Sequence, residues 1–318
     1  MVEELSKKLE AQILQTHTSW VLVLKEVVYK IKKPVNFGFL DYSTLEKRLE
    51  NCKREVELNK RLCPWVYLGV VPISLVDGRY VIEDASNPVE YAVKMRRIPE
   101  ESLLKNLLSK VSQEDMKRLA KHIAKFHLRA ERKDDFGRLE VMKFNTDENF
   151  IQTEKYIGIT ISKEDYEFIK GRTEYFYENY RELFEKRIRD GRIRDGHGDI
   201  RLEHVAFLKE GVCIFDCIEF NERFRCGDML NDMCFLSMEL DLYGRQDLSR
   251  VYEEEYRITT EDEEFEIFLH FFKGYRAYVR GKVNSFLLDD PNYPKKEEAK
   301  ELAQKLFQLS KKYAEQIP

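Results

Sequence analysis

The chain has 318 residues, 43% of them hydrophobic and 35% charged, so it can bury a sizeable core beneath a polar surface. Its 54 basic and 58 acidic residues leave a net charge of −4 at pH 7. This balance excludes a dedicated binder of nucleic acids or anionic membranes, because such proteins carry a basic excess. No apolar run approaches the length that crosses a bilayer, and the first residues predict an amphipathic helix rather than a signal peptide. We therefore expect a cytoplasmic protein that binds neither nucleic acid nor membranes.

Six cysteines are present, and none of them forms a CxxC pair: Cys52, Cys63, Cys213, Cys217, Cys226 and Cys234. Because nothing in the sequence indicates an oxidising compartment, we expect all six to be reduced thiols. The last four fall within 22 residues, a spacing that also invites a zinc site. We disfavour zinc, because Cys213 and Cys217 lie in an apolar, strand-like run where buried cysteine is ordinary packing.

The first 95 residues predict a small sheet with one long helix. Runs rich in β-branched residues predict strands at 20–24, 27–32, 66–73, 79–83 and 89–95. Asp77-Gly78 is a hairpin signal between the third and fourth of these strands. A first helix is expected at residues 3–14. The long helix follows the capping box Ser43-Thr44-Leu45-Glu46, in which Ser43 caps the helix, and Pro64 ends it.

After Pro99 the pattern becomes helical. Helices are expected at 101–108, 113–130 and 163–189, the second and third of them behind the capping serines Ser112 and Ser162. A short β insert follows, with strands at 205–208 and 212–215. From there the chain is predicted to be helical to its end.

Strands therefore precede helices instead of alternating with them, which argues against a doubly wound α/β fold. The sequence contains no GxxxxGK[ST] motif and no GxGxxG motif after a strand, so it signals neither a P-loop nor a Rossmann site. We expect an α+β chain of two lobes. Residues 1–95 form the sheet lobe, 96–99 a hinge and 100–318 the helical lobe.

Two aspartates around the β insert carry the clearest chemical signal. Asp199 lies in the glycine-flanked loop Gly196-His197-Gly198 that precedes the insert, and Asp216 follows the second strand of the insert. A hairpin brings its two ends together, so we expect both carboxylates at one site. Phosphoryl transfer to a hydroxyl needs a carboxylate near the acceptor oxygen and another that holds magnesium on the phosphates.

These residues resemble a known superfamily. His197-Gly198-Asp199 resembles the HGDxxxxN catalytic loop of aminoglycoside phosphotransferases and choline-kinase-like enzymes, and Ile214-Phe215-Asp216 resembles the strand end that carries their magnesium-binding aspartate. Two further stretches are similar to segments of the superfamily: Ile123-Ala124-Lys125-Phe126-His127, and Gly227-Asp228 followed by Asn231-Asp232-Met233-Cys234-Phe235-Leu236. The resemblance implies a bilobal, protein-kinase-like fold that binds ATP and Mg²⁺.

The similarity extends to a bacterial subgroup of unassigned function that is sometimes fused to a C-terminal P-loop domain. Its recurring segments resemble residues 29–35, 37–41, 55–59, 215–221 and 275–283. Such a match covers nearly the whole chain, and it says little about the substrate.

The resemblance assigns roles to individual residues. Asp199 would be the catalytic base or hydroxyl-orienting residue, and Asp216 would bind magnesium. Lys30 would hold the ATP phosphates, with Lys32 as the second choice because it lies on the same strand face. Glu55 would pair with that lysine. The hinge whose backbone binds adenine would comprise Met95, Arg96, Arg97 and Ile98.

The sequence departs from the superfamily pattern in two places. His204 stands where a magnesium-binding asparagine is expected, and imidazole is a poor ligand for Mg²⁺, so Asp216 or Glu219 would have to compensate. There is also no glycine-rich loop between the first two predicted strands. The turn at residues 15–19, which precedes those strands, offers hydroxyl and backbone N–H groups in its place.

The predicted function is a kinase that moves the γ-phosphoryl group of Mg-ATP to a hydroxyl of a small molecule. Asn149, Gln152 and Arg201 are the candidate contacts to this acceptor. Two alternatives stay open. One is a catalytically weak or inactive nucleotide-binding pseudokinase with a regulatory role, which His204 favours. The other is transfer of AMP by the same fold.

Overall fold

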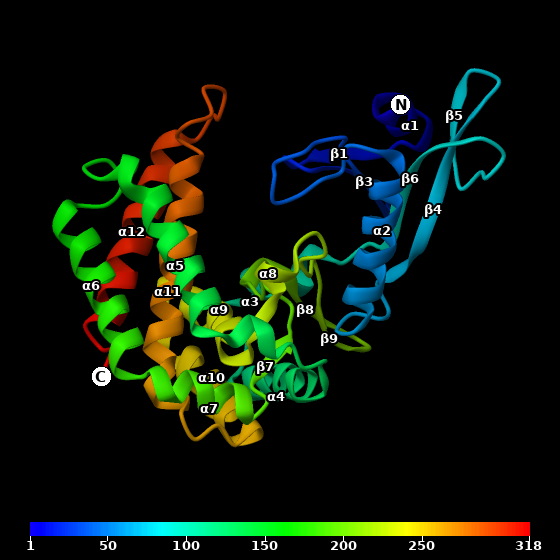
Figure 1. Ribbon diagram of the computed structural model, residues 1–318. Coiled ribbons are helices and arrows are strands. Elements are labelled where there is room, and N and C mark those ends of the chain that lie inside the picture. Colours follow the sequence, from blue (N-terminus) through cyan, green and yellow to red (C-terminus); the bar gives the residue numbers. More distant parts are fainter. The chain divides into compact units, whose positions relative to one another are not determined.

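The computed structural model describes residues 1–318 (Figure 1). The chain divides into two compact units, and each unit draws on two stretches of the sequence. The first unit comprises Met1–Lys110 and Glu203–Arg225, and the second comprises Val111–Leu202 and Cys226–Pro318. The sequence places residues 100–110 and 203–225 in the helical lobe, whereas in the structure both stretches group with the sheet.

The first unit is built on a six-stranded antiparallel sheet with the strand order β1-β2-β3-β6-β4-β5. Its strands are β1 (Gln12–Gln15), β2 (Ser19–Val23), β3 (Val27–Lys32), β4 (Tyr67–Val76), β5 (Arg79–Ile82) and β6 (Pro88–Arg96). All five predicted strands are present, and the Asp77-Gly78 hairpin joins β4 to β5 as expected.

The first helix is shorter than predicted. Helix α1 (Val2–Leu9) ends where Glu10 adopts a left-handed backbone, and residues 12–15 form the edge strand β1 instead of another helical turn. The physical reason is pairing. β1 completes an antiparallel ladder with the open edge of β2, from Gln12 opposite Val23 to Gln15 opposite Trp20. This ladder outweighs the weak helical preference of so short a segment.

Helix α2 (Leu45–Lys60) packs against β4 and β6. It is capped by Thr44, whose side chain accepts from the Lys47 amide, so the predicted cap at Ser43 is one residue too early. Cys52 and Val56 of α2 share a buried core with Tyr67 and Val93 of the sheet. This shared core holds helix α2 against the sheet.

The hairpin of β8 (Val205–Leu208) and β9 (Gly211–Ile214) belongs to the first unit because it completes this same core. Ala206 and Cys213 are buried in the cluster with Cys52 and Val56. Residues 100–107 join the same unit through an isolated antiparallel β-bridge between Leu103 and Ala206. This stretch is not the regular helix that the sequence predicts at 101–108, but a 3₁₀ turn (Glu100–Ser102) followed by the single-turn helix α3 (Leu104–Leu107). The unit ends in the short helix α8 (Glu222–Arg225).

Two cysteines contradict the expectation of reduced thiols. Cys63, just after α2, and Cys213 of β9 form a disulfide, with their Cα atoms 4.6 Å apart. They lie 150 residues apart in the chain, so cysteine spacing gives no hint of the pairing. The remaining cysteines are buried free thiols: Cys52, Cys217, Cys226 and Cys234.

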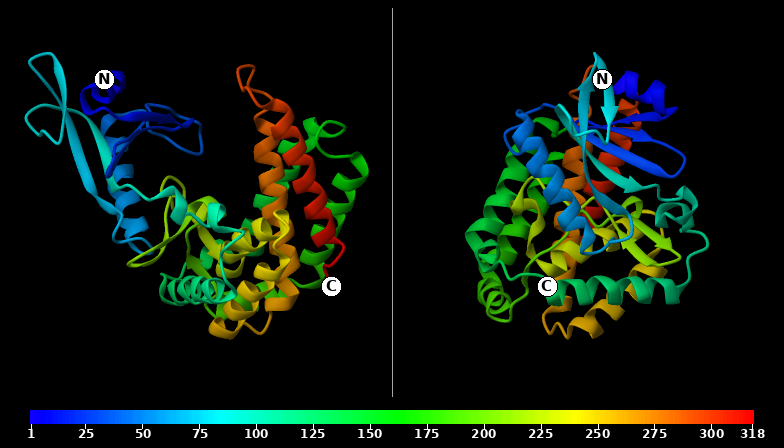
Figure 2. Two further views of the ribbon diagram at one scale, coloured as in Figure 1. Left: turned by 180° about the vertical axis from the view of Figure 1, so that it is seen from behind. Right: turned by 90° about the vertical axis from the view of Figure 1, so that its right-hand side faces the viewer.

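The second unit is mainly helical. Its helices are α4 (Gln113–Arg129), α5 (Leu139–Thr153), α6 (Lys163–Asn179), α7 (Arg181–Arg189), α9 (Met229–Leu242), α10 (Gln246–Thr260), α11 (Phe265–Phe286) and α12 (Lys296–Ala314). A two-stranded ribbon of β7 (Ile193–Asp195) and β10 (Cys226–Asp228) lies among them. Helices α11 and α12 pack side by side along most of their length (Figure 2). No helix in the chain is both long enough and apolar enough to cross a membrane.

The helix predicted at 163–189 is interrupted. Tyr180 leaves the helical conformation and separates α6 from α7. The break lets aromatic residues of both helices reach the same partners on α11. Phe176 of α6 and Phe184 of α7 each contact Phe268 and Phe271. Aromatic packing in the core therefore overrides a continuous helical pattern.

Thiol titration tests the disulfide. Unreduced, denatured protein should show four reactive thiols and reduced protein six, because only Cys63 and Cys213 are paired. The Cys63→Ser/Cys213→Ser variant should lose about 2–4 kcal/mol of unfolding free energy, since an open chain has more conformational freedom when unfolded. Urea unfolding measures this loss, with Cys234→Ala, which removes a free thiol, as the control. Six thiols before reduction would contradict the pairing.

Candidate active site

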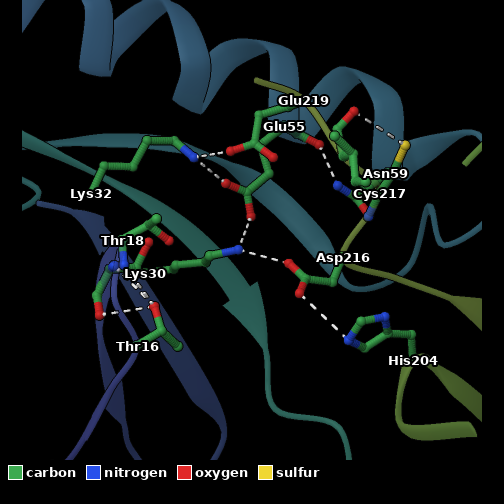
Figure 3. A network of polar contacts seen from close by, with 12 residues as sticks. Thr16, Thr18, Lys30, Lys32, Glu55, Asn59, His204, Asp216, Cys217 and Glu219 are labelled. Carbon is green, nitrogen blue, oxygen red and sulfur yellow. Dashed lines mark hydrogen bonds and ion pairs between the residues drawn. The ribbon is translucent and has the colours of Figure 1, made fainter. Parts of the chain in front are cut away.

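A partly buried lysine of the sheet joins two carboxylates in the first unit. Lys30 Nζ of β3 lies 2.8 Å from Glu55 Oε1 of α2 and 2.8 Å from Asp216 Oδ1, which follows β9 (Figure 3). The Glu55 side chain is fully buried, whereas that of Asp216 is 45% exposed. The site thus has a closed side, formed by α2, and an open side at Asp216.

The second predicted lysine lies on the same face. Lys32 is two residues further along β3, so its side chain points the same way. It contacts Glu55 Oε2 at 2.7 Å and also binds Glu219, which in turn accepts a hydrogen bond of 2.6 Å from the Tyr42 hydroxyl. Glu55 therefore serves two lysines, one with each oxygen.

The charges of this network stabilise one another. Burial alone would lower the pKa of Lys30, but the charges of Asp216 and Glu55 outweigh it and hold that pKa well above its usual value. Burial would likewise raise the pKa of Glu55, and the two lysines lower it instead. Lys30 and Lys32 are therefore cations and Glu55 an anion across the physiological pH range.

Asp216 is held in an uncommon backbone conformation. Its φ of 62° lies in the left-handed region that residues other than glycine rarely adopt. Its amide donates to the Tyr67 hydroxyl at 3.1 Å, and the next amide, that of Cys217, donates to Asn59 Oδ1 at 2.9 Å. Surrounding contacts thus fix a strained residue, an arrangement that is typical of functional sites.

The three predicted metal ligands occupy different positions. His204 Nε2 lies 3.6 Å from Asp216 Oδ2, so these two side chains adjoin. Glu219 is buried against Lys32 and Tyr42 instead. No group of three or more His, Cys, Asp or Glu side chains in the chain is arranged to hold a metal ion. A hard cation such as Mg²⁺ prefers oxygen ligands, and the solvent-facing oxygen donor here is the Asp216 carboxylate.

The predicted hinge runs from the end of β6. The amides of Arg96 and Arg97 already donate to the carbonyls of Val66 and Glu26, at 2.8 Å each, and Met95 and Ile98 pack onto the core around Tyr67. The backbone amides of Arg96 and Arg97 are therefore already engaged in hydrogen bonds within the protein.

Because β1 is present, the turn at residues 16–18 lies within the sheet instead of before it. This turn now joins the first two strands of the sheet. Thr16 Oγ1 accepts hydrogen bonds from the amides of Thr18 and Ser19, at 3.3 and 3.0 Å. With β1 as the first strand of the sheet, a short threonine-closed turn without glycine therefore joins the first two strands.

In the second unit, Asp199 follows β7 in a tightly held loop. The amides of His197 and Gly198 donate to the two oxygens of Asp232 in α9, at 2.6 and 2.8 Å. Gly198 has a φ of 86°, a conformation that favours glycine at this turn. The Asp199 amide donates to His197 Nδ1 at 3.2 Å, so that ring orients the loop. Arg201 Nε lies 2.9 Å from Asp199 Oδ1.

Buried partners fix Asp232 in turn. His127 Nε2 lies 3.1 Å from Asp232 Oδ2, and His127 Nδ1 lies 2.7 Å from the Tyr256 hydroxyl. Burial alone would raise the pKa of Asp232, but the hydrogen bond from His127 and the charges of His127, His197 and Arg276 lower it. A carboxylate at the start of α9 also benefits from the helix dipole.

The remaining acceptor candidates lie on α5. Asn149 Oδ1 and Gln152 Oε1 both accept hydrogen bonds from Lys282 Nζ of α11, at 2.6 and 2.7 Å. These two amides thus hold a lysine, whereas Arg201 is placed at Asp199.

Several contributors to the site have no role in the sequence-based assignment: Tyr42, Asn59, Tyr67, Asp232 and Tyr256. Asp232 lies in a stretch that resembles the superfamily, and this resemblance is the signal that marks it. Asn59 likewise lies in a stretch that resembles the bacterial subgroup. The other three act through side-chain contacts that the sequence alone does not indicate, each to a residue more than 100 positions away.

Comparison with known proteins places this geometry in context. No protein-family model matches the sequence. A protein of uncharacterized function from Mycobacterium tuberculosis is 30% identical over 276 residues, which cover 85% of this chain and 54% of the relative. A Mycobacterium bovis protein matches to the same extent. The chain spans about half the length of the curated relatives that it matches.

Solved structures show the fold. A choline kinase from Cryptosporidium parvum superposes with a TM-score of 0.58 at 13% identity, over 99% of this chain and 90% of the kinase. The aminoglycoside phosphotransferase APH(2″)-Ib, solved with ADP, superposes with a TM-score of 0.50 at 17% identity, over 99% of this chain and 98% of that enzyme. The chain therefore has the α+β, kinase-like fold of these phosphotransferases, and the predicted resemblance is confirmed at the level of fold.

Replacing Asp232 by Asn tests the anchoring of the loop. At pH 7 the variant should lose about 3 kcal/mol of unfolding free energy, because the buried N–H groups and His127 lose their charged partner. The folded chain lowers the pKa of Asp232, so protonation favours unfolding. The difference from wild type should therefore shrink as the pH falls below about 4, where the unfolded carboxyl takes up its proton.

Urea unfolding between pH 3 and 8 measures this difference. Asp135→Asn, at a carboxylate that is 79% exposed in the same unit, is the matched control and should change stability by less than about 0.5 kcal/mol. A pH-independent loss in the Asp232 variant would contradict the role of the carboxylate charge.

Proposed function

We propose that the chain is an ATP-dependent phosphotransferase that moves the γ-phosphoryl group of Mg-ATP to a hydroxyl group of a small molecule. The observation that carries this proposal is Lys30 Nζ, 2.8 Å from both the buried Glu55 and the solvent-facing Asp216. Phosphate oxygens need a fixed cation, and their metal needs a carboxylate at the same place. The fold shared with a choline kinase and with an ADP-bound aminoglycoside phosphotransferase supports the same assignment.

Of the two lysines, Lys30 is the better candidate for the phosphate contact. Its side chain is 18% exposed, and it touches the open carboxylate, Asp216. Lys32 is 1% exposed and is enclosed by Glu55, Glu219 and Tyr42. A phosphate could reach Lys32 only by displacing buried partners, whereas Lys30 has only to exchange Asp216 for the incoming anion.

Asp216 is the residue that we assign to Mg²⁺. When bound, the metal supplies positive charge to the phosphate oxygens. Asp216 would then leave Lys30 for the metal, and Lys30 would turn to the phosphates. Both exchanges replace one ion pair by another, so neither leaves a charge unpaired.

Asp199 is the residue that we assign to the acceptor. Its carboxylate would orient the hydroxyl and take its proton as the new O–P bond forms and ADP leaves. The Asp232 clamp on the loop amides supports this role, because a proton acceptor must be held within hydrogen-bond reach of its donor. Arg201, beside Asp199, is the acceptor contact with the best support, ahead of Asn149 and Gln152.

One observation favours a second candidate function. His204 lies 3.6 Å from Asp216, and Glu219 is bound to Lys32, so neither of the other two predicted ligands offers the metal a second carboxylate. A nucleotide-binding pseudokinase needs only one carboxylate for the metal. It would bind ATP through Lys30 and regulate a partner without turnover.

Nucleotide binding and hydrolysis by three variants test the proposal. Lys30→Met should weaken ATP binding at least about tenfold, because the phosphates lose a charge-assisted contact. Asp216→Asn should abolish the gain in affinity that Mg²⁺ brings. Asp199→Asn should bind Mg-ATP normally and lose about 10²–10⁴-fold in turnover, the usual contribution of a general base. Calorimetry and ADP release measure these changes.

Lys155→Met is the matched control for loss of a lysine charge, because this exposed side chain pairs with Asp289 in the second unit. Tight ATP binding without hydrolysis, unchanged by Asp199→Asn, would select the pseudokinase. Release of pyrophosphate in place of ADP, with AMP bonded to the acceptor, would indicate nucleotidyl transfer. Absence of nucleotide binding would sink both candidates.

A further inference from the structure

Lys32 is a buried charge to which the proposed reaction gives no direct task. Its side chain is 1% exposed, and its ammonium group is paired within the protein. It contacts Glu55 Oε2 at 2.7 Å, binds Glu219 Oε1 and lies 3.3 Å from the Tyr42 hydroxyl (Figure 3). Burying a lysine together with two carboxylates is expensive unless each group is well paired, so the arrangement calls for an explanation.

The partners of Lys32 come from three separate parts of the first unit. Glu55 belongs to α2, Tyr42 to the loop between β3 and α2, and Glu219 to the segment Asp216–Glu219. That segment begins with the residue assigned to the metal and ends with the residue that Lys32 binds. Within it, the Cys217 amide is held by Asn59, one turn after Glu55 on α2.

The electrostatics are consistent with a fixed bridge. Burial alone would lower the pKa of Lys32, but the charges of Glu219 and Glu55 hold it well above its usual value. Tyr42 closes the bridge by donating to Glu219 at 2.6 Å. Two carboxylates from different elements are thus joined through one cation that water scarcely reaches.

We propose that Lys32 is a positioning residue, whose buried ammonium group bridges Glu55 and Glu219 and thereby holds the segment Asp216–Glu219 on helix α2. In this account Glu219 is an anchor for the segment and not a metal ligand. Because it assigns Asp216 to Mg²⁺, the functional part of this inference rests on the proposed function. The positioning itself does not.

The chain contains its own control for a merely structural lysine. Lys273 of α11 is 4% exposed and also bridges two carboxylates, Asp241 and Glu253. It lies in the second unit. After substitution its partner Asp241 keeps the Tyr313 hydroxyl, as Glu55 keeps Lys30. The two lysines therefore share burial and pairing, and only Lys32 touches the segment that carries Asp216.

The experiment compares two double variants that replace each bridge by apolar residues of similar volume. Lys32→Met/Glu219→Met and Lys273→Met/Glu253→Met should both fold, because apolar pairs often replace buried ion pairs without loss of stability. Thermal unfolding checks this. Hydrogen exchange of the peptide that covers residues 216–219 is then measured without any ligand, and Mg-ATP affinity is measured with and without EDTA.

We expect faster exchange of that peptide only in the Lys32 double variant. The same variant should lose about 10–100-fold in Mg²⁺-dependent ATP affinity, the usual effect of removing a residue that supports a metal ligand. The Lys273 double variant should match wild type in both measurements. If the Lys32 variant is equally stable and its exchange is unchanged, the positioning role is overturned.

The two proposals fail in different ways. If wild-type protein binds no Mg-ATP, the proposed function falls, and the exchange experiment still decides whether Lys32 holds the segment. If wild type binds Mg-ATP and the Lys32 double variant binds it equally well, the proposed function survives and the functional part of the inference falls. Single substitutions are less informative here, because either one leaves an unpaired buried charge that destabilises the fold by itself.

Discussion

The geometry of the first unit depends on one buried carboxylate that serves two cations. Glu55 has no contact with solvent, and each of its oxygens binds a lysine of the same strand. A charge in such a place persists only if it is neutralised on the spot. Two ion pairs therefore join strand β3 to helix α2, and breaking either of them would leave a buried charge unpaired. The two carboxylates that complete the network, Asp216 and Glu219, lie on one short segment and are oriented by the same pair of lysines.

The second unit uses the opposite arrangement, in which a carboxylate holds backbone amides instead of side-chain cations. Asp232 accepts from two consecutive amides of the Asp199 loop, and His127 and Tyr256 stand behind it. The loop is thus anchored through its backbone, and the Asp199 side chain pairs with Arg201. In both units, then, the residue assigned to the chemistry is only partly buried, at 45% exposure for Asp216 and 23% for Asp199, while the carboxylates that support the arrangement, Glu55 and Asp232, are buried.

Local signals in the sequence predict much of this fold. Capping serines, the Asp77-Gly78 hairpin and runs of β-branched residues place most strands and helices, because each reflects a preference of a few neighbouring residues. The failures share a cause. Strand β1 exists through its ladder with β2, the break at Tyr180 through packing on α11, and the Cys63–Cys213 bond through a contact across 150 residues. Likewise Asp216 is indicated by its place after the β insert and Lys30 by resemblance, whereas the contacts of Tyr42 and Asn59 depend on the folded chain.

The discontinuity of the first unit has a consequence for synthesis on the ribosome. The core around Cys52 and Val56 is closed by Ala206 and Cys213, which are translated only after the whole first stretch of the second unit, Val111–Leu202. The apolar face of the sheet therefore stays uncovered while residues 111–202 are being synthesised. Nascent chains with such exposed surfaces are the ones that chaperones retain. Completion of this buried core is thus a late event in the biogenesis of the protein.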